Sequence, residues 1–566
     1  MGKPVITVQC GNYANYVGSH YWNLQEAGFV YSREGGGGDN SKAEKEVLEV
    51  DNDVLYREGL TLNKEVTYTP RLVVLDLKGS LGSLPECGEL YGRTTVPKAG
   101  TLSMNWAGEH QVFKEEPHKK NDFLREMDNE AQNEEESEKD VDNSMEGAEK
   151  DDTNGLYSLD GQVSFWSDYL GARFHPKSVL LCDSFQHENT THPFDMWGLG
   201  RGAWKDSRGL GDEMEDRLRF FAEECDNLGG FQVVADYHDG FGGVSASVLD
   251  LLSDEYSSKS LLSFPCAPAE YSSYSVAEGG ARLAGAVLSL ASHLESGLVT
   301  PLSLAKDWFP LSGRVTKFPH LTYNPSSHYS SSSILALAMD TATLPCRRRA
   351  GSGGMLSMGE VCQGMASHGR KLAALSADIP LDMQGIEYFE KDVLSHPSTI
   401  IPGYSVSTDT SMTYTTMLTV RGIKSQALYS KRSQHFLPCP TPTSYLETCV
   451  HNAHPQCRPV GTFFTKPAST GKPFPHIFSS KVTCYGSVGK EDRPSNTGVS
   501  IAPVLTTWET GPRAESAIRS LVSKAGKLSL AKVHRLGESG VEGEEWDEAK
   551  EKLAELAECY TESDMD

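Results

Sequence analysis

Residues 219–247 have the sequence RFFAEECDNLGGFQVVADYHDGFGGVSAS, and this stretch decides the fold. A helix-like segment ends near Cys225, and two glycines then lead into an apolar run, 231–235, typical of a buried strand. A loop of small residues and an apolar helical pattern follow. Strand, glycine-rich loop and helix in this order are typical of phosphate sites, because glycines let backbone approach an anion and the helix offers free N–H groups. Ligand-free turns share this pattern, so alone it leaves both interpretations open.

Two earlier segments have a related organisation. A short β pattern at 5–8 is followed by the run Gln9, Cys10, Gly11 and Asn12, and a second apolar strand pattern at 70–77 ends around Asp76. These turns, together with the E-C-D-x-L-x-G-F-Q order before the glycine loop, resemble the signature segments of tubulins. Three strand ends in the same order over about 240 residues favour a shared fold over chance.

Other segments resemble the misato family, a group of tubulin-related proteins with His-Asp-Gly-Phe in place of the tubulin triple glycine. The segments that carry this resemblance are His238-Asp239-Gly240-Phe241, Trp166-Ser167-Asp168-Tyr169-Leu170 and His175-Pro176. The resemblance implies an α/β fold: a tubulin-like nucleotide-binding domain with a parallel sheet, then a smaller α+β domain and C-terminal helices.

The expected domain organisation combines this resemblance with composition. Residues 1–113 and 156–390 form the tubulin-like domain, with its core helix near 334–344, and residues 114–155 form an acidic insertion. Residues 391–510 show alternating patterns, at Tyr404 to Ser407, 414–420 and Lys481 to Tyr485, and form the second domain. Residues 511–566 supply C-terminal helices and an acidic tail.

Charge is unevenly distributed along the chain, whose net charge is −25. Residues 115–152 contain 16 acidic and 5 basic residues, and residues 538–566 contain 12 and 2, so these segments hold 21 of the 25 negative charges. The remainder is nearly neutral and lacks the basic face of a nucleic-acid-binding protein. Because the first acidic segment has few large apolar residues, among them Phe123 and Leu124, we expect it to be disordered.

Two further clusters suggest anion or metal binding, and in each case we favour a plainer interpretation. Arg347, Arg348 and Arg349 adjoin several glycines, a composition typical of a solvated, flexible loop. A second cluster lies within nineteen residues but matches no common zinc spacing, so no metal site is expected there. Its members are Cys439, Cys449, His451, His454 and Cys457.

Twelve cysteines are scattered through the chain without a secretory start or an apolar run of the ~20 residues that span a bilayer. We therefore expect reduced thiols and a cytoplasmic location. Residues 513–535 carry six basic residues and one acidic residue between apolar residues at helical spacing. This pattern fits either an interfacial membrane helix or a helix packed on the second domain against the acidic helix at 544–558.

The tubulin resemblance implies that GTP is the candidate cofactor, although the residues leave open whether it binds. The implied nucleotide-binding residues are Gln9, Cys10, Gly11, Asn12, Asp76, Gly240, Gly242, Gly243, Ser245 and Asn324. Four features depart from the tubulin pattern. Lys78 replaces a magnesium-binding glutamate, Asp239 brings a carboxylate into the loop, and Thr341 stands where asparagine is expected. The Asn-x-Asp-x-x-acid loop is missing, the nearest stretch being 376–382, so we predict no catalytic and no metal-binding residues.

The misato resemblance implies a non-enzymatic or degenerate tubulin-like protein that regulates mitochondrial distribution, morphology and fusion. It also implies peripheral association with the mitochondrial outer membrane, a cytoplasmic pool, and chaperonin or tubulin-related partners. Two alternatives stay open: a GTP-binding switch, and a tubulin-like GTPase acting in spindle or microtubule organisation.

Overall fold

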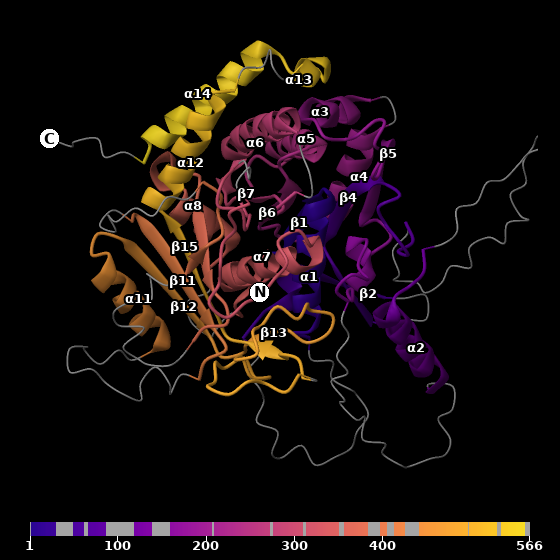
Figure 1. Cartoon of the computed structure of the whole chain (residues 1–566), viewed down its shortest axis with the longest axis vertical. Helices are drawn as coiled ribbons and strands as arrows, with labels where there is room; N and C mark the ends of the chain where they lie inside the picture. Colours follow the sequence, from indigo (N-terminus) through magenta and orange to yellow (C-terminus); the bar gives the residue numbers. More distant parts are fainter. Residues whose placement is uncertain are drawn as a thin grey trace, which may run out of the picture.

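The computed structural model places two sheets and their helices in one body (Figure 1). It describes residues 2–29, 49–60, 66–86, 118–137, 159–206, 209–271, 275–308, 313–349, 356–382, 397–403, 413–424, 441–495, 497–528 and 534–560.

A six-stranded parallel sheet forms the centre of the tubulin-like domain, in the order β5-β4-β1-β6-β7-β8. Val8 of β1 pairs with Val73 on one side and with Val233 on the other. The sheet is apolar and buried on both faces, as a parallel sheet covered by helices requires. Its strands are β1 (Val5–Cys10), β4 (Leu72–Lys78), β5 (Val179–Gln186), β6 (Gly230–Asp236), β7 (Ser260–Cys266) and β8 (Leu298–Val299).

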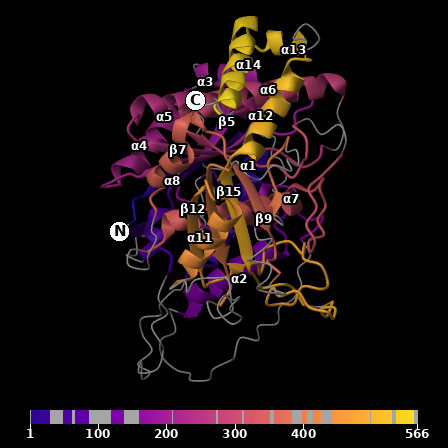
Figure 2. The same ribbon diagram turned by 90° about the vertical axis from the view of Figure 1, so that its left-hand side faces the viewer.

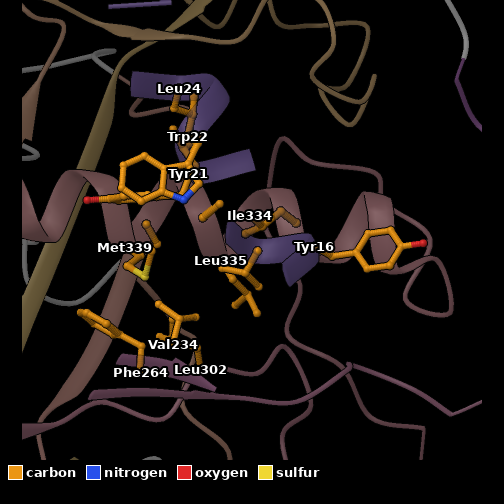
Figure 3. Close-up of a cluster of buried hydrophobic side chains, with 14 of the residues drawn as sticks. Tyr16, Tyr21, Trp22, Leu24, Val234, Phe264, Leu302, Ile334, Leu335 and Met339 are labelled. Atoms are coloured by element: carbon orange, nitrogen blue, oxygen red, sulfur yellow. The ribbon is translucent and has the colours of Figure 1, made fainter. Parts of the chain in front are cut away.

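Helices cover both faces of this sheet, as the strand and helix patterns predict. Ile6 and Val8 share a core with α4 (Leu210–Glu223) and α5 (Gly240–Glu255), while α3 (Trp197–Lys205) packs on α5. On the other face lie α1 (Asn12–Glu26) and α7 (His328–Thr343). Figure 3 shows Trp22 of α1 and Met339 of α7 gathered above Val234 and Phe264 of the sheet. The fold class is therefore confirmed.

The second sheet has the order β10-β9-β15-β11-β12 and packs against α7, so that this helix is shared by the two sheets. Because β9 belongs to it, the second sheet begins before residue 391. The strands are β9 (Ala374–Asp378), β10 (Ser398–Thr399), β11 (Thr415–Arg421), β12 (Arg458–Phe464) and β15 (Val504–Thr510). Its covering helices are α8 (Met358–Met365) and α11 (Pro442–Ala453), and two small ladders pair β2 (Tyr56–Leu60) with β3 (Val66–Pro70) and β13 (Ala468–Ser469) with β14 (Ile501–Ala502).

The C-terminal helices pack on α6 (Val276–Ser296) and include α12 (Pro512–Ala525), α13 (His534–Glu538) and α14 (Gly543–Glu558). The apolar face of α12, with Ile518 and Leu521, is buried in a core shared with α6 and α14. Lys524 pairs with Asp307, and Arg519 pairs with Glu515 of its own helix. The packed-helix interpretation is thus the one the structure supports, although the pairing partners lie outside the 544–558 helix.

Two sequence expectations about secondary structure are wrong. Part of the insertion that we expected to be disordered forms α2 (Asp122–Ser137), because Phe123 and Leu124 are buried in the main core and Asn121 caps the helix by accepting the N–H of Leu124 at 3.0 Å. Residues 481–485 form no strand; Val482 makes one isolated bridge to Val488. The expected strand at 404–407 and residues 138–152 lie outside the described residues.

No helix within the described ranges is long and apolar enough to cross a membrane.

Candidate functional site

The carboxyl ends of β1, β4 and β6 bring most of the predicted nucleotide-binding residues to one edge of the sheet. This edge is where open α/β sheets bind ligands, beside the N-termini of the helices that follow the strands. The structure places two helix N-termini there, those of α1 and α5.

A carboxylate of the protein itself occupies the N-terminus of α1. Asp236, the last residue of β6, accepts the N–H of Tyr13 at 2.9 Å and the N–H of Ala14 at 2.8 Å. Gly11, the residue before the helix, has a φ of 114°, and an added Cβ would lie 2.5 Å from Oδ2 of Asp236. The glycine lets a neighbouring strand supply the cap that usually comes from the preceding residue. An incoming phosphate would have to displace this buried carboxylate.

A second carboxylate occupies the N-terminus of α5. Asp239 is the N-cap residue and accepts the N–H of Phe241 at 2.9 Å. Burial, with repulsion from Asp76 and Asp195, raises the pKa of Asp239 to about 7. Burial, followed by repulsion from Asp239, also raises the pKa of Asp236 well above its usual range. Two carboxylates thus stand at the two helix N-termini, and each makes a further anion less favourable.

Asp76 lies at the same edge but is fully engaged with its neighbours. It accepts the side-chain N–H groups of Asn15 and Trp166, both at 2.9 Å, and the backbone N–H of Leu77 at 2.7 Å. Burial raises its pKa. Lys78, two residues further on, is exposed. Asp76 therefore orders α1 and the Trp166 segment.

The glycines of the predicted phosphate loop serve close packing between helices. An added Cβ at Gly243 would lie 2.0 Å from the backbone oxygen of Trp197 in α3, and one at Gly242 would lie 2.1 Å from Oγ of Ser289 in α6. At Gly240 it would meet the ring of Phe194 at 2.6 Å. Since backbone, hydroxyl and aromatic atoms fill these positions, the loop presents these glycines to the protein interior.

The remaining candidates divide into buried and exposed residues. Ser245 is fully buried, with its hydroxyl 2.9 Å from the carbonyl of Gly242 and 3.1 Å from Nε2 of His293. Gln9 packs under α1, where an added Cβ on Gly18 would meet its amide, and Cys10 is buried with a raised thiol pKa.

Two polar candidates do face outward. Asn12 is half-buried at the first turn of α1. Asn324 is exposed, and its side chain accepts the N–H of Ser326 at 3.1 Å, closing a local turn. Thr341, which stands where tubulins have asparagine, is buried and donates its hydroxyl to the carbonyl of Leu337 at 2.9 Å. The edge therefore brings most of the predicted residues together, and other groups of the protein contact most of them.

Comparison with known proteins shows that the chain is similar to tubulin-related domains. The misato segment II tubulin-like domain model matches residues 3–129, and a tubulin domain model matches residues 158–348. Protein misato homolog 1 of Danio rerio is 32% identical over 99% of this chain and 97% of its own length. The chain belongs to the misato family. Misato homolog 1 of Mus musculus is 30% identical and protein misato of Drosophila melanogaster is 28% identical, each over 99% of this chain and 98% and 99% of their own lengths.

The His-Asp-Gly-Phe segment of this misato-family chain has a structural role at each position. His238 is largely buried, with burial and nearby Arg282 lowering its pKa to about 3, so it is neutral at physiological pH. Asp239 caps α5, Gly240 fits against Phe194, and Phe241 is buried with its ring edge-on to that of Phe194 at 5.1 Å. The segment closes the loop that an open phosphate site would need.

Two features of this site are not predicted by the sequence. Asp236 follows the predicted strand by one residue, and its position after an apolar run was the available signal. The stretch 376–382, compared above with a catalytic loop, begins in the buried strand β9, so Ser376 and Asp378 are paired in a sheet.

The arginine triplet is the clearest correction to the sequence analysis. Arg347 and Arg348 are buried, whereas we expected a solvated loop. Arg347 pairs with Asp340 of α7 at 2.7 Å, and Arg421 of β11 pairs with the other oxygen of Asp340 at 2.6 Å. Gln25 of α1 hydrogen-bonds both Asp340 and Arg347. This cluster joins the two sheets through their shared helix.

Nothing in the described part of the chain forms a group of three or more His, Cys, Asp or Glu arranged to hold a metal ion. Cys449, His454 and Cys457 of the predicted cluster are buried, His451 is exposed, and Cys439 lies outside the described residues.

Proposed function

We propose that this misato-family protein is a non-enzymatic tubulin-like scaffold that regulates mitochondrial distribution, morphology and fusion. The observation that carries the non-enzymatic part is the Asp236 carboxylate on the N-terminus of α1. It takes the N–H groups that a phosphate would use, so an internal carboxyl group stands where a nucleotide would otherwise bind. Family resemblance supports the mitochondrial part.

We further propose that the protein acts from the cytoplasm and from the surface of the mitochondrial outer membrane, with chaperonin or tubulin-related partners. The apolar face of α12 is buried against α6 and α14. That helix would have to leave the core to enter lipid, so we propose membrane contact through a partner protein.

Isothermal titration with Mg·GTP tests the proposal that the protein is a scaffold that does not bind or hydrolyse nucleotide. We expect no heat of binding for the native protein up to millimolar GTP, and no hydrolysis that rises with protein concentration. The GTP-switch and GTPase alternatives require the opposite result, a micromolar Kd in the native protein.

A variant sharpens this experiment. Asp236→Ser removes the carboxylate and frees the N–H groups of Tyr13 and Ala14, so we expect weak binding of inorganic phosphate or GTP to emerge. Asp254→Asn, an exposed acid on α5, removes the same charge away from the edge and serves as the control. Thermal unfolding of each variant shows whether the fold is retained.

The cellular role is tested by replacing the endogenous protein and imaging the mitochondrial network. We expect wild-type protein and Asp254→Asn to restore network shape and fusion rate equally. A normal network in cells lacking the protein would contradict the mitochondrial proposal and would leave the scaffold proposal untouched.

A further inference from the structure

The opposite edge of the six-stranded sheet carries two hollows on either side of α8. One is a cavity of about 490 Å³ at the start of β7 and β8, and the other is a groove of about 340 Å³ over β11 and β12. Glu360 and Gln363 of α8 line both. Figure 2 shows α8 between β7 and β12 on the side that faces the viewer. We call these two hollows and the helix between them the α8 face.

The two hollows differ in chemistry. Three lysines line the cavity: Lys3, Lys259 and Lys371. The groove is mainly apolar, with Arg458 at its border, and its apolar residues are Leu356, Val361, Met365, Met417 and Val460. A ligand that spans α8 would therefore meet positive charge on one side and an apolar slot on the other.

Within the described ranges no salt bridge joins these cations to a carboxylate, although the positive charge of Lys3 helps to lower the pKa of Glu360 in the same cavity. Lys371 donates to the backbone carbonyl of Glu295 at 2.9 Å and keeps its charge exposed to the cavity. Glu360 lines the same cavity, and Ser357 holds its carboxylate by an N–H at 2.7 Å and a hydroxyl at 2.7 Å. A chain with a net charge of −25 thus places three lysines and a single carboxylate in one hollow.

We propose that the α8 face binds an acidic peptide of a partner protein, with carboxylates in the lysine cavity and one apolar side chain in the groove. Charge complementarity selects an acidic ligand, and the apolar slot selects a peptide with a hydrophobic anchor beside its acids. The cations lie in a concavity beside α8. A membrane surface makes its contacts with projecting basic residues, so a flexible chain fits this shape better.

Fluorescence anisotropy with the full-length protein tests the proposal, using a labelled Asp-Glu-Glu-Leu-Glu-Glu-Asp peptide as the probe. We expect saturable binding at 50 mM salt that weakens at least fivefold at 300 mM, because the contacts are partly exposed ion pairs. Lys3→Glu/Lys259→Glu should weaken binding at least tenfold. Lys317→Glu/Lys490→Glu makes the same charge change outside the α8 face and should alter binding less than twofold.

A change in the probe keeps the test independent of protein folding. Replacing the leucine of the peptide by serine should weaken binding about fivefold, since the groove loses its apolar occupant. Equal affinity for the two peptides, equal loss in both lysine pairs, or no saturable binding would overturn the proposal. So would binding to phosphatidylserine vesicles, or self-association in sedimentation, that the Lys3→Glu/Lys259→Glu change abolishes while the peptide does not bind.

Discussion

Two buried aspartate centres of this protein have opposite electrostatics. Asp340, in the helix shared by both sheets, is held by Arg347 and Arg421, and these cations keep its pKa below the usual range despite burial. Asp236 is equally buried at the end of β6, but its partners are the backbone N–H groups of α1, and its pKa is raised well above the usual range.

The difference shows what each centre does. The Asp340 carboxylate links the two domains through its ion pairs with two arginines, whose full positive charges compensate its negative charge. A carboxylate at a helix N-terminus, with Asp239 nearby, is compensated only by partial charges. Burial and the neighbouring Asp239 therefore favour the neutral form of this carboxyl group, which makes the site unfavourable for a further anion.

Removing the ion pairs of Asp340 should have the largest effect on the free energy of unfolding. Asp340→Asn leaves Arg347 and Arg421 buried beside each other without a counter-charge, so we expect a loss of about 3–5 kcal/mol in the free energy of unfolding. Urea denaturation measures it. Asp307→Asn is the matched control, because Asp307 also has two cationic partners, Lys524 and Arg314, but lies at the surface; its loss should stay below about 1 kcal/mol. Equal losses in Asp340→Asn and Asp307→Asn would show that the ion pairs of Asp340 do not link the two domains.

The next prediction concerns the glycine loop beside Asp236 and Asp239. Gly243→Ala forces a methyl group against the backbone of α3, at 2.0 Å from the oxygen of Trp197, and should cost about 1–3 kcal/mol. Gly202→Ala in α3 meets nothing within 4 Å and should be neutral or stabilising by up to about 1 kcal/mol. Thermal unfolding distinguishes the two. An unaffected Gly243→Ala variant would mean that the loop is open after all.

The pH dependence of stability tests the contrast directly. Asp239 has a pKa of about 7 in the folded protein against an ordinary value of 3.8, so the folded state keeps a proton that the unfolded state has released. Its contribution therefore falls as pH rises from about 4 to about 7 and is constant above that. Asp340 behaves in the opposite sense, and its contribution is lost as pH falls below about 4.

Asp239→Asn should flatten the dependence between pH 4 and 7. Asparagine can still accept the N–H of Phe241, so the cap remains while the buried charge is removed. At pH 8 we expect the variant to be about 2 kcal/mol more stable than the native protein. Chemical denaturation from pH 4 to 8 measures this, with Asp254→Asn as the control. A steeper slope in Asp239→Asn would contradict the assignment.

Local patterns sufficed for three neighbouring strands of the tubulin-like sheet and for the meeting of most candidate residues at one edge. The apolar runs at 5–8, 70–77 and 231–235 predicted β1, β4 and β6, because a parallel sheet buried on both faces requires continuous apolar residues. The family segments then set their order.

Burial of polar residues could not be predicted in the same way, because it depends on partners distant in sequence. Arg347 is seven residues from Asp340, but the second cation, Arg421, comes from the other sheet. The capping role of Asp236 depends on β1 and β6 being neighbours, 223 residues apart at the Tyr13 contact. In α2, two apolar residues are buried in the main core, which the acidic composition of the segment did not indicate.

The smallest effect is expected for the ion pair between Lys524 and Asp307 at the surface, in contrast to the buried ion pairs of Asp340. Lys524→Glu replaces an attraction at 3.2 Å by a repulsion, but both side chains are partly exposed, at 29% and 23%, and Arg314 still pairs with Asp307. Solvent screening should therefore limit the loss in unfolding free energy to about 1 kcal/mol. Lys527→Glu, on the exposed turn after α12, should change stability by less than about 0.5 kcal/mol.

Because the apolar face of α12 is buried, flotation with anionic liposomes should be the same for both variants and the native protein. Binding of the native protein that salt weakens and Lys524→Glu abolishes would show instead that α12 leaves the core to reach lipid.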